Sequence, residues 1–158
     1  MTDVRSEWRP DLLELGSADW VFNGTDLESG QDLETAVIIS LFTDRLAHPD
    51  DRLPDPHDGD RRGVWFDWDA DEFGLIGSRL WLISREKQTE EVRLRIEGYC
   101  NEALAWLLED DVADSVAVTA AWNPQAPGRV DVDIVITREA RVLLHRNFSW
   151  AWRQIFPI

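Results

Sequence analysis

Residues 90–109 read EEVRLRIEGYCNEALAWLLE, and this stretch decides the fold. Large apolar side chains recur in it with the spacing i, i+4, i+7, i+11 and i+14, which places them on one side of a helix. The residues with this spacing are Val92, Ile96, Tyr99, Ala103 and Trp106 or Leu107. Thr89 can cap free amides at the helix start, and Glu90 and Glu91 suit the positive end of the helix dipole. A helix this apolar on one side needs a partner surface.

The partner surface is predicted after residue 111, where the period of the apolar residues changes from helical spacing to two. Loops at residues 123–128 and 137–141 divide this region into three strands. Adjacent strands with short links form an antiparallel meander, predicted here over residues 112–152. The positions expected to face the helix are Val116, Val118, Ala120 and Trp122, then Val130, Val132, Ile134 and Ile136, then Val142, Leu144, Phe148, Trp150 and Trp152.

A second helix is predicted over residues 33–46, with Gln31 or Asp32 near its cap. Leu33, Val37 and Leu41 follow helical spacing. The other large apolar side chains, which make this helix apolar nearly all round and predict that it is well buried, are Ile38, Ile39 and Phe42. The β-branched run at residues 37–39 leaves a strand as the alternative. A short third helix is expected over residues 78–85.

The N-terminal region is predicted to be peripheral. Residues 1–10 are polar apart from Trp8 and are expected to form a loose arm. Two short β-prone runs, residues 11–15 and 19–22, predict a short hairpin. The fold class is therefore α+β, with two or three helices on one face of a small antiparallel sheet of three to four strands. All 158 residues are expected to form one domain.

A long loop is predicted between the second and third helices. Residues 47–77 are rich in Pro, Gly, Asp and Arg. A loop of about thirty residues in a compact domain is normally functional or disordered. Its aromatic residues argue against disorder, because a flexible loop gains nothing by exposing them. These side chains, which need either the core or another chain, are Trp65, Phe66, Trp68 and Phe73.

The composition limits the classes of partner. A formal charge of −15 argues against binding to a nucleic-acid backbone or an anionic membrane. The single cysteine, Cys100, excludes an intrachain disulfide and suits a reducing cytoplasm. No apolar run resembles a signal peptide or a membrane span. Nine Trp residues are unusual, and Trp is enriched where proteins bind proteins.

Two acidic clusters have some of the residues that a metal site needs. Residues 67–71 match the opening ligands of a calcium loop, but Glu72 stands where glycine is required and Ser78 where a bidentate Glu is required. A second cluster has irregular spacing and favours a polar surface loop over a metal centre. Its members are His48, Asp50, Asp51, His57, Asp58 and Asp60. We therefore expect no metal ion and no cofactor.

The sequence gives little support to a catalytic site. The chain holds 31 acidic residues, so almost any carboxylate pair could be nominated for glycoside hydrolysis. Cys100 lies beside the apolar stripe, which is typical of an inert buried thiol. His145 alternates with apolar residues and is expected to be an exposed strand residue. No catalytic residue and no small-molecule substrate are predicted.

The motif at residues 61–67, RRGVWFD, has a composition typical of protein interfaces. Two guanidinium groups beside two aromatic rings occur both at interface hot spots and in internal anchors. Arg61 or Arg62 could therefore contact a partner or could hold the long loop on its own domain. Both interpretations stay open from the residues alone.

Several motifs, in order along the chain, resemble one family. They are LETAV (33–37), ISLFTDR (39–45), LPD (53–55), RRG (61–63) with Trp65 and Asp67, GSRLWL (77–82) and EALAWL (102–107). Together they resemble the small baseplate protein family of Mu-like contractile-tailed phages and prophages, over about residues 33–116. The family usually has a tandem Trp followed by Gly after the Arg-Arg-Gly, whereas this chain has Val64, Trp65 and Phe66.

The resemblance implies a function. The family is similar to baseplate wedge proteins of T4-like and P2-like phages, which implies a non-enzymatic structural subunit where sheath and tube meet the baseplate. Other tail proteins would be its partners, and it would pass from the host cytoplasm into the virion tail. The predicted contacts are the loop at residues 54–71 and an exposed strand edge. The residues expected to bind partners are Arg61, Arg62, Trp65, Phe66, Asp67, Trp68, Arg79 and Trp81.

Two alternatives belong to other classes. A muramidase-like hydrolase of cell-wall glycan would need two carboxyl groups about 5–9 Å apart in a cleft. A metal-stabilised module would use the Asp-rich loop and would melt at a lower temperature with a chelator.

Overall fold

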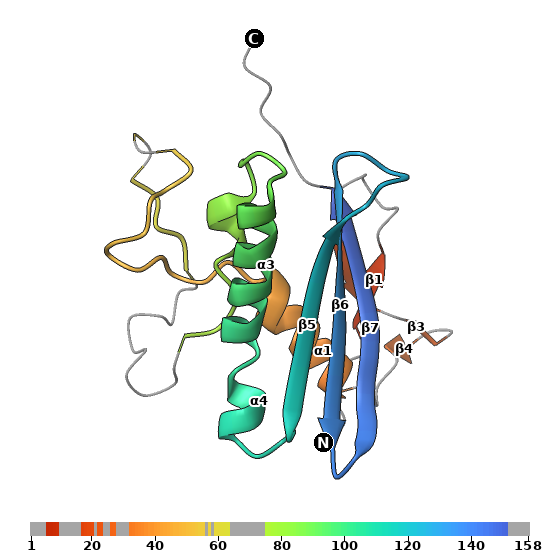
Figure 1. Ribbon diagram of the computed structural model, residues 1–158. Helices are drawn as coiled ribbons and strands as arrows, with labels where there is room; N and C mark the ends of the chain where they lie inside the picture. Colours follow the sequence, from red (N-terminus) through yellow and green to blue (C-terminus); the bar gives the residue numbers. More distant parts are fainter. Residues whose placement is uncertain are drawn as a thin grey trace.

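The computed structural model describes residues 6–9, 17–20, 22–23, 26–27, 32–55, 57, 59–63 and 75–151. Its main elements are helix α1 (Asp32–Phe42), a 3-10 turn η3 (Leu80–Ile83), helices α3 (Glu90–Ala103) and α4 (Trp106–Glu109), and strands β5 (Ser115–Trp122), β6 (Arg129–Arg138) and β7 (Arg141–Ala151). Figure 1 shows α1, α3 and α4 gathered beside the sheet formed by β5, β6 and β7. The predicted α+β arrangement is confirmed.

The sheet has the strand order β5-β6-β7, and both pairs are antiparallel. Val132 of β6 lies opposite Ala120 on one side and Phe148 on the other. The face toward the helices is apolar, and its β6 side chains are Val130, Val132, Ile134 and Ile136, which are all fully buried. The predicted meander is confirmed.

The inward face of β7 differs from the prediction at its start. The register shifts between Ile136 and Thr137, so that β7 has an extra residue there. A bulge of this kind interrupts the alternation of side chains. Val142, predicted to face the helices, is 61% exposed, whereas Leu144 and Phe148 are buried. Trp152, predicted to face the same way, lies outside the described residues.

The central helix begins as predicted but is not continuous. The Thr89 side chain accepts a hydrogen bond of 3.2 Å from the Val92 amide and caps α3. After Ala103 the chain makes a tight turn before α4, with the Leu107 amide bonded to the Leu104 carbonyl at 3.1 Å. Leu104 lies at the margin of the stripe of α3, and the turn lets Leu104 and Leu107 both reach full burial. The prediction of one helix over residues 90–109 is wrong at this turn.

Helix α1 is confirmed, and it packs against β7. The Phe42 ring meets Phe148 and Trp150 edge-on, with centroid distances of 5.7 and 5.5 Å. Glu34 near the helix start accepts hydrogen bonds of 2.8 and 3.0 Å from Arg146. These contacts fix α1 across the sheet.

The burial of α1 was predicted too broadly, because Ile39 is 46% exposed. The helix also ends at Phe42, four residues before the predicted end. The next carbonyl, that of Thr43, accepts a hydrogen bond from the Ser78 amide, and Arg45 N–H bonds to the Ser78 carbonyl. Backbone groups committed to a second segment cannot continue a helix.

The peripheral elements are shorter or displaced. The predicted helix over residues 78–85 is a single 3-10 turn, η3, whose four side chains are buried. The N-terminal hairpin pairs β1 (Ser6–Arg9) with β2 (Ser17–Trp20), so its first strand lies inside the predicted arm. The run at residues 11–15 lies outside the described residues. A second small pair joins β3 (Phe22–Asn23) to β4 (Asp26–Leu27).

Gly98 gives a test of the helix assignment. It lies within α3, and a Cβ built at this position would meet no atom within 4 Å. Glycine in a helix interior costs about 1 kcal/mol relative to alanine. Gly98→Ala should therefore raise the free energy of unfolding in urea by about 1 kcal/mol, and Gly98→Ser by less. An unchanged or lower stability in Gly98→Ala would contradict an open helical position.

Candidate functional site

The long segment at residues 47–77 begins and ends at one place beside α1. Asp44 and Ser78 form a parallel bridge, with hydrogen bonds of 3.0 Å from Arg45 N–H to the Ser78 carbonyl and 2.9 Å from Ser78 N–H to the Thr43 carbonyl. The Ser78 hydroxyl donates to the Leu41 carbonyl at 2.5 Å. This bridge fixes both ends of the segment on the turn that follows α1. We call it the base of the segment.

Gly77 is required at the base. Its φ is +99°, in the region that side chains rarely adopt. A Cβ at this residue would lie 2.4 Å from the Thr43 carbonyl oxygen. The two backbones can approach closely enough to bond only because residue 77 has no side chain.

Arg79 joins the base to the central helix. Its guanidinium donates hydrogen bonds of 2.9 and 3.0 Å to Asp51 and of 2.9 and 3.2 Å to Glu102 of α3. It also stacks over the Tyr99 ring, 4.7 Å from the centroid. One largely buried cation therefore holds the start of the long segment, the base and α3 together.

The ionisation of this cluster follows from its contacts. Burial raises the pKa of Asp51, but the hydrogen bonds from Arg79 and from the His48 amide outweigh it and hold the pKa below its ordinary 3.8. Burial lowers the pKa of Arg79, and its bonds to Glu102 and Asp51 more than reverse this effect. The Arg79–Asp51 pair is therefore charged at neutral pH.

Arg61 and Arg62 both find partners within the chain. The Arg61 side chain donates to the His48 carbonyl. Arg62 pairs with Asp44 and lies over the Trp81 ring, 4.7 Å from its centroid. These contacts are those expected of arginines that hold the segment on its own domain. A further contact of either residue with a partner stays a prediction.

Trp81 lies beneath the base. Its side chain is 6% exposed, and its indole N–H donates to the Arg45 carbonyl at 2.8 Å. In the free chain it supports the base and presents little surface to a partner. Four other predicted contact residues lie outside the described residues: Trp65, Phe66, Asp67 and Trp68.

The edge of β5 is covered at Ala120. The Ala120 amide donates to Glu97 of α3 at 2.9 Å, and Arg93 of α3 donates to the Ala120 carbonyl at 3.1 Å. Both backbone groups therefore point away from β6 and are already bonded. A partner strand that paired along β5 would first have to displace these side chains, so this edge is not an open template.

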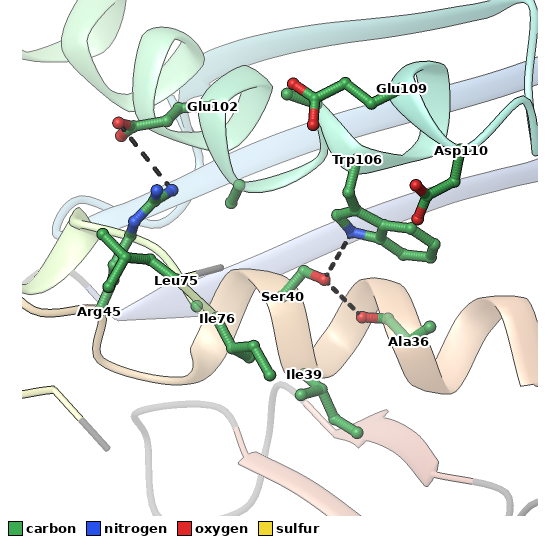
Figure 2. A pocket seen from close by; sticks show the side chains of 13 residues that line it. Ala36, Ile39, Ser40, Arg45, Leu75, Ile76, Glu102, Trp106, Glu109 and Asp110 are labelled. Carbon is green, nitrogen blue, oxygen red and sulfur yellow. Dashed lines mark hydrogen bonds and ion pairs between the residues drawn. The ribbon is translucent and has the colours of Figure 1, made fainter. Parts of the chain in front are cut away.

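A groove lies between α1 and the α3–α4 turn, and sequence reasoning missed it. Its volume is about 680 Å³. Figure 2 shows Ile39 of α1 and Trp106 of α4 at this groove, with Glu109 and Asp110 beside the indole. The Trp106 N–H donates to the Ser40 hydroxyl at 3.1 Å, and that hydroxyl donates to the Ala36 carbonyl at 2.8 Å.

The sequence matches the model of the family described as Phage protein GP46 over residues 33–142. The chain belongs to this GP46 family. It is 48% identical over 107 residues to baseplate protein gp46 of Escherichia phage Mu, a match that covers 68% of each chain. It is 37% identical over 125 residues to the Mu-like prophage FluMu protein gp46 of Haemophilus influenzae, covering 79% of each. The predicted resemblance to Mu-like baseplate proteins is confirmed.

The GP46 match covers the parts that build the site. Its range of residues 33–142 includes most of α1, both ends of the long segment, α3 and the sheet up to the start of β7. The resemblance seen in the sequence extended only to about residue 116. The family match therefore reaches further into the meander.

The described residues show little that suits metal or nucleophile chemistry. Within them, no group of three or more His, Cys, Asp or Glu side chains could hold a metal ion. The calcium-like run at residues 67–71 lies outside that part of the chain. Burial, with the nearby Glu97 charge, raises the pKa of the Cys100 thiol to about 12, so Cys100 is an inert core residue. No described helix has the length and apolar character needed to cross a membrane.

Sequence reasoning selected Arg79 but missed the residues that bind it. The sequence places Asp51 only in an acidic cluster, and Glu102 only in the motif at residues 102–107. Asp51 lies 28 positions and Glu102 23 positions from Arg79. Pairings of this separation leave no local pattern in a single sequence.

Proposed function

We propose that this chain is a structural subunit of a contractile tail baseplate in a phage or prophage, where it binds neighbouring baseplate proteins. The observation that carries the proposal is the 48% identity to the Mu baseplate protein over 107 residues. The chain is made in the host cytoplasm and becomes part of the virion tail. It acts by binding and not by catalysis.

The binding surface that we assign is the segment at residues 54–71, presented by the base. These residues are the middle of the long segment at residues 47–77. Arg79 binds both Asp51, near the start of the long segment, and Glu102 of α3. Gly77, at its other end, lets the backbone approach the turn after α1. A rigid base lowers the entropy lost when a partner binds. Arg61, Arg62 and Trp81 complete this support, and Trp65, Phe66, Asp67 and Trp68 supply the contact side chains typical of hot spots.

The charge supports protein partners. At −15 the chain repels phosphate backbones and anionic lipids, and Arg62 and Arg79 are already paired with carboxylates. Tail proteins with basic surfaces are the partners that this charge favours.

No observation favours the glycan hydrolase. A general acid in such an enzyme needs a raised pKa. In the described part of the chain, the carboxyl groups with a resolved shift are Asp51 and Glu90. Arginine neighbours hold the pKa of each below its ordinary value.

The proposal is tested by deletion and complementation. A phage or prophage that lacks this gene should produce no intact contractile tails, and the wild-type gene should restore them. The triple variant Trp65→Ala, Phe66→Ala, Trp68→Ala should fold with a normal urea unfolding curve but restore about tenfold fewer tails by electron microscopy. Asp50→Lys with Glu139→Lys, at exposed residues outside the range 54–71, is the control and should restore tails fully.

Intact tails in the deletion strain would overturn the function. Full rescue by the triple variant would instead overturn only the assignment of residues 54–71.

A further inference from the structure

We propose that the groove between α1 and the α3–α4 turn docks a basic, amphipathic segment of another polypeptide. The inference rests on the proposed function, because it requires neighbouring proteins, but the residues that line this groove are not among residues 54–71. The groove is lined on one side by Ala36, Ile39 and Ser40 of α1. These residues have the spacing i, i+3 and i+4, so they form one face of that helix.

The groove is open, and apolar side chains line part of it. Small residues keep it hollow: Ala36, Gly77, Ala103 and Ala105. Ile39 and Ile76 line it with 46% and 37% of their surfaces exposed. Trp106 is held in place by its bond to Ser40, so the pocket wall is fixed before any partner arrives (Figure 2). A preformed hollow with exposed apolar side chains is typical of helix-in-groove recognition.

The rim of the groove is negatively charged. Glu109 and Asp110 line it, are exposed, and have no ion pair among those of the described residues. Arg45 is the basic residue in the lining, and it lies 3.9 Å from the third acid, Glu102, which offsets its charge. Helices α3 and α4 both end at the groove, and their C-terminal carbonyl groups add negative potential.

The negative charge at the rim favours a positively charged segment as the occupant of the groove. A second copy of the chain carries the same charge of −15 and would be repelled. A segment with apolar side chains on one face and Lys or Arg beside them can fill the floor and pair with Glu109 and Asp110. The acids at the rim would increase the association rate and determine the orientation of such a segment.

The first test uses three synthetic helical peptides as probes. One has leucines on one face and lysines and arginines on the other; the second has glutamates in place of the basic residues; the third has serines in place of the leucines. In NMR titrations of the full chain, the first peptide should shift the signals of Ile39, Ile76 and the Trp106 indole N–H. The acidic and leucine-free peptides should leave these signals unchanged.

Variants of the chain identify the contacts. Glu109→Lys with Asp110→Lys should weaken binding of the first peptide about tenfold, and Ile39→Gln should weaken it similarly. Asp50→Lys with Glu139→Lys changes the same charge at exposed residues outside the groove lining, and affinity should change by less than about twofold. Equal losses in both double variants, or no binding at millimolar peptide, would overturn the proposal.

The second test uses the assembled particle. A photo-crosslinking amino acid at position 39 in purified tails should attach to a segment of another tail protein that carries apolar residues flanked by Lys or Arg. A crosslink to an acidic segment, to a second copy or to nothing would overturn the groove assignment. Normal tail assembly in the same preparation would show that the proposed baseplate function survives that failure.

Discussion

Replacing Gly77 with alanine is expected to lower the free energy of unfolding by about 3 kcal/mol. The residue has a φ of +99°, and the added Cβ would lie 2.4 Å from the Thr43 carbonyl oxygen. That oxygen is backbone and accepts the Ser78 hydrogen bond, so it cannot move away without breaking the bridge at the base. Urea unfolding followed by circular dichroism measures the loss.

Gly59→Ala is the matched control. Gly59 also has a positive φ, of +65°, but a Cβ there would meet no atom within 4 Å. Gly59→Ala should therefore lower the free energy of unfolding only by the cost of a side chain at positive φ, about 1 kcal/mol. If Gly77→Ala costs no more than Gly59→Ala, the close approach at the base is not a feature of the folded protein.

Arg79→Met is expected to lower the free energy of unfolding by about 2 kcal/mol near neutral pH. Methionine keeps much of the aliphatic stem but leaves Asp51 and Glu102, both largely buried, without the guanidinium that binds them. Removing one partner of such a cluster costs more than the interaction contributed, because the remaining charges stay desolvated. Arg62→Met removes a more exposed ion pair, that with Asp44, and should cost less than about 1 kcal/mol.

The loss in Arg79→Met should depend on pH. Asp51 has a folded-state pKa below 3.8, so its ionisation stabilises the fold above that value and ceases to do so as the pH falls through the folded-state pKa. The difference between wild type and Arg79→Met should therefore shrink in acid. A difference that stays constant from neutral pH into acid would contradict the charge pairing between Arg79 and Asp51.

Local patterns in the sequence predicted the main elements. The Thr89 cap, the stripe of α3 and the alternation of β6 each depend on residues close in sequence, and all three are found in the structure. The turn at Leu104 was not predictable from the same stripe. It arises because Leu104 and Leu107 both reach the core, which is a property of the packed structure.

Long-range pairing set the limits of prediction at the candidate site. The motif at residues 61–67 allowed either a partner contact or an internal anchor, and the structure shows internal contacts for Arg61 and Arg62. The anchoring role of Arg79 depends on two carboxylates brought together only by the fold. The groove was not predicted because its walls come from segments far apart in the sequence. In addition, Ile39, which lines it, was expected to be buried. The family, by contrast, was identifiable from ordered motifs, and the GP46 match confirms it.

The central claim is that this chain is a baseplate subunit whose long segment contacts its neighbours. An electron cryomicroscopy map of the assembled tail tests it most directly. We expect density for the α+β domain at the baseplate, with residues 54–71 against another polypeptide and the Arg79 cluster intact. A finished tail whose baseplate lacks this chain, or holds it with residues 54–71 facing solvent, would contradict the account.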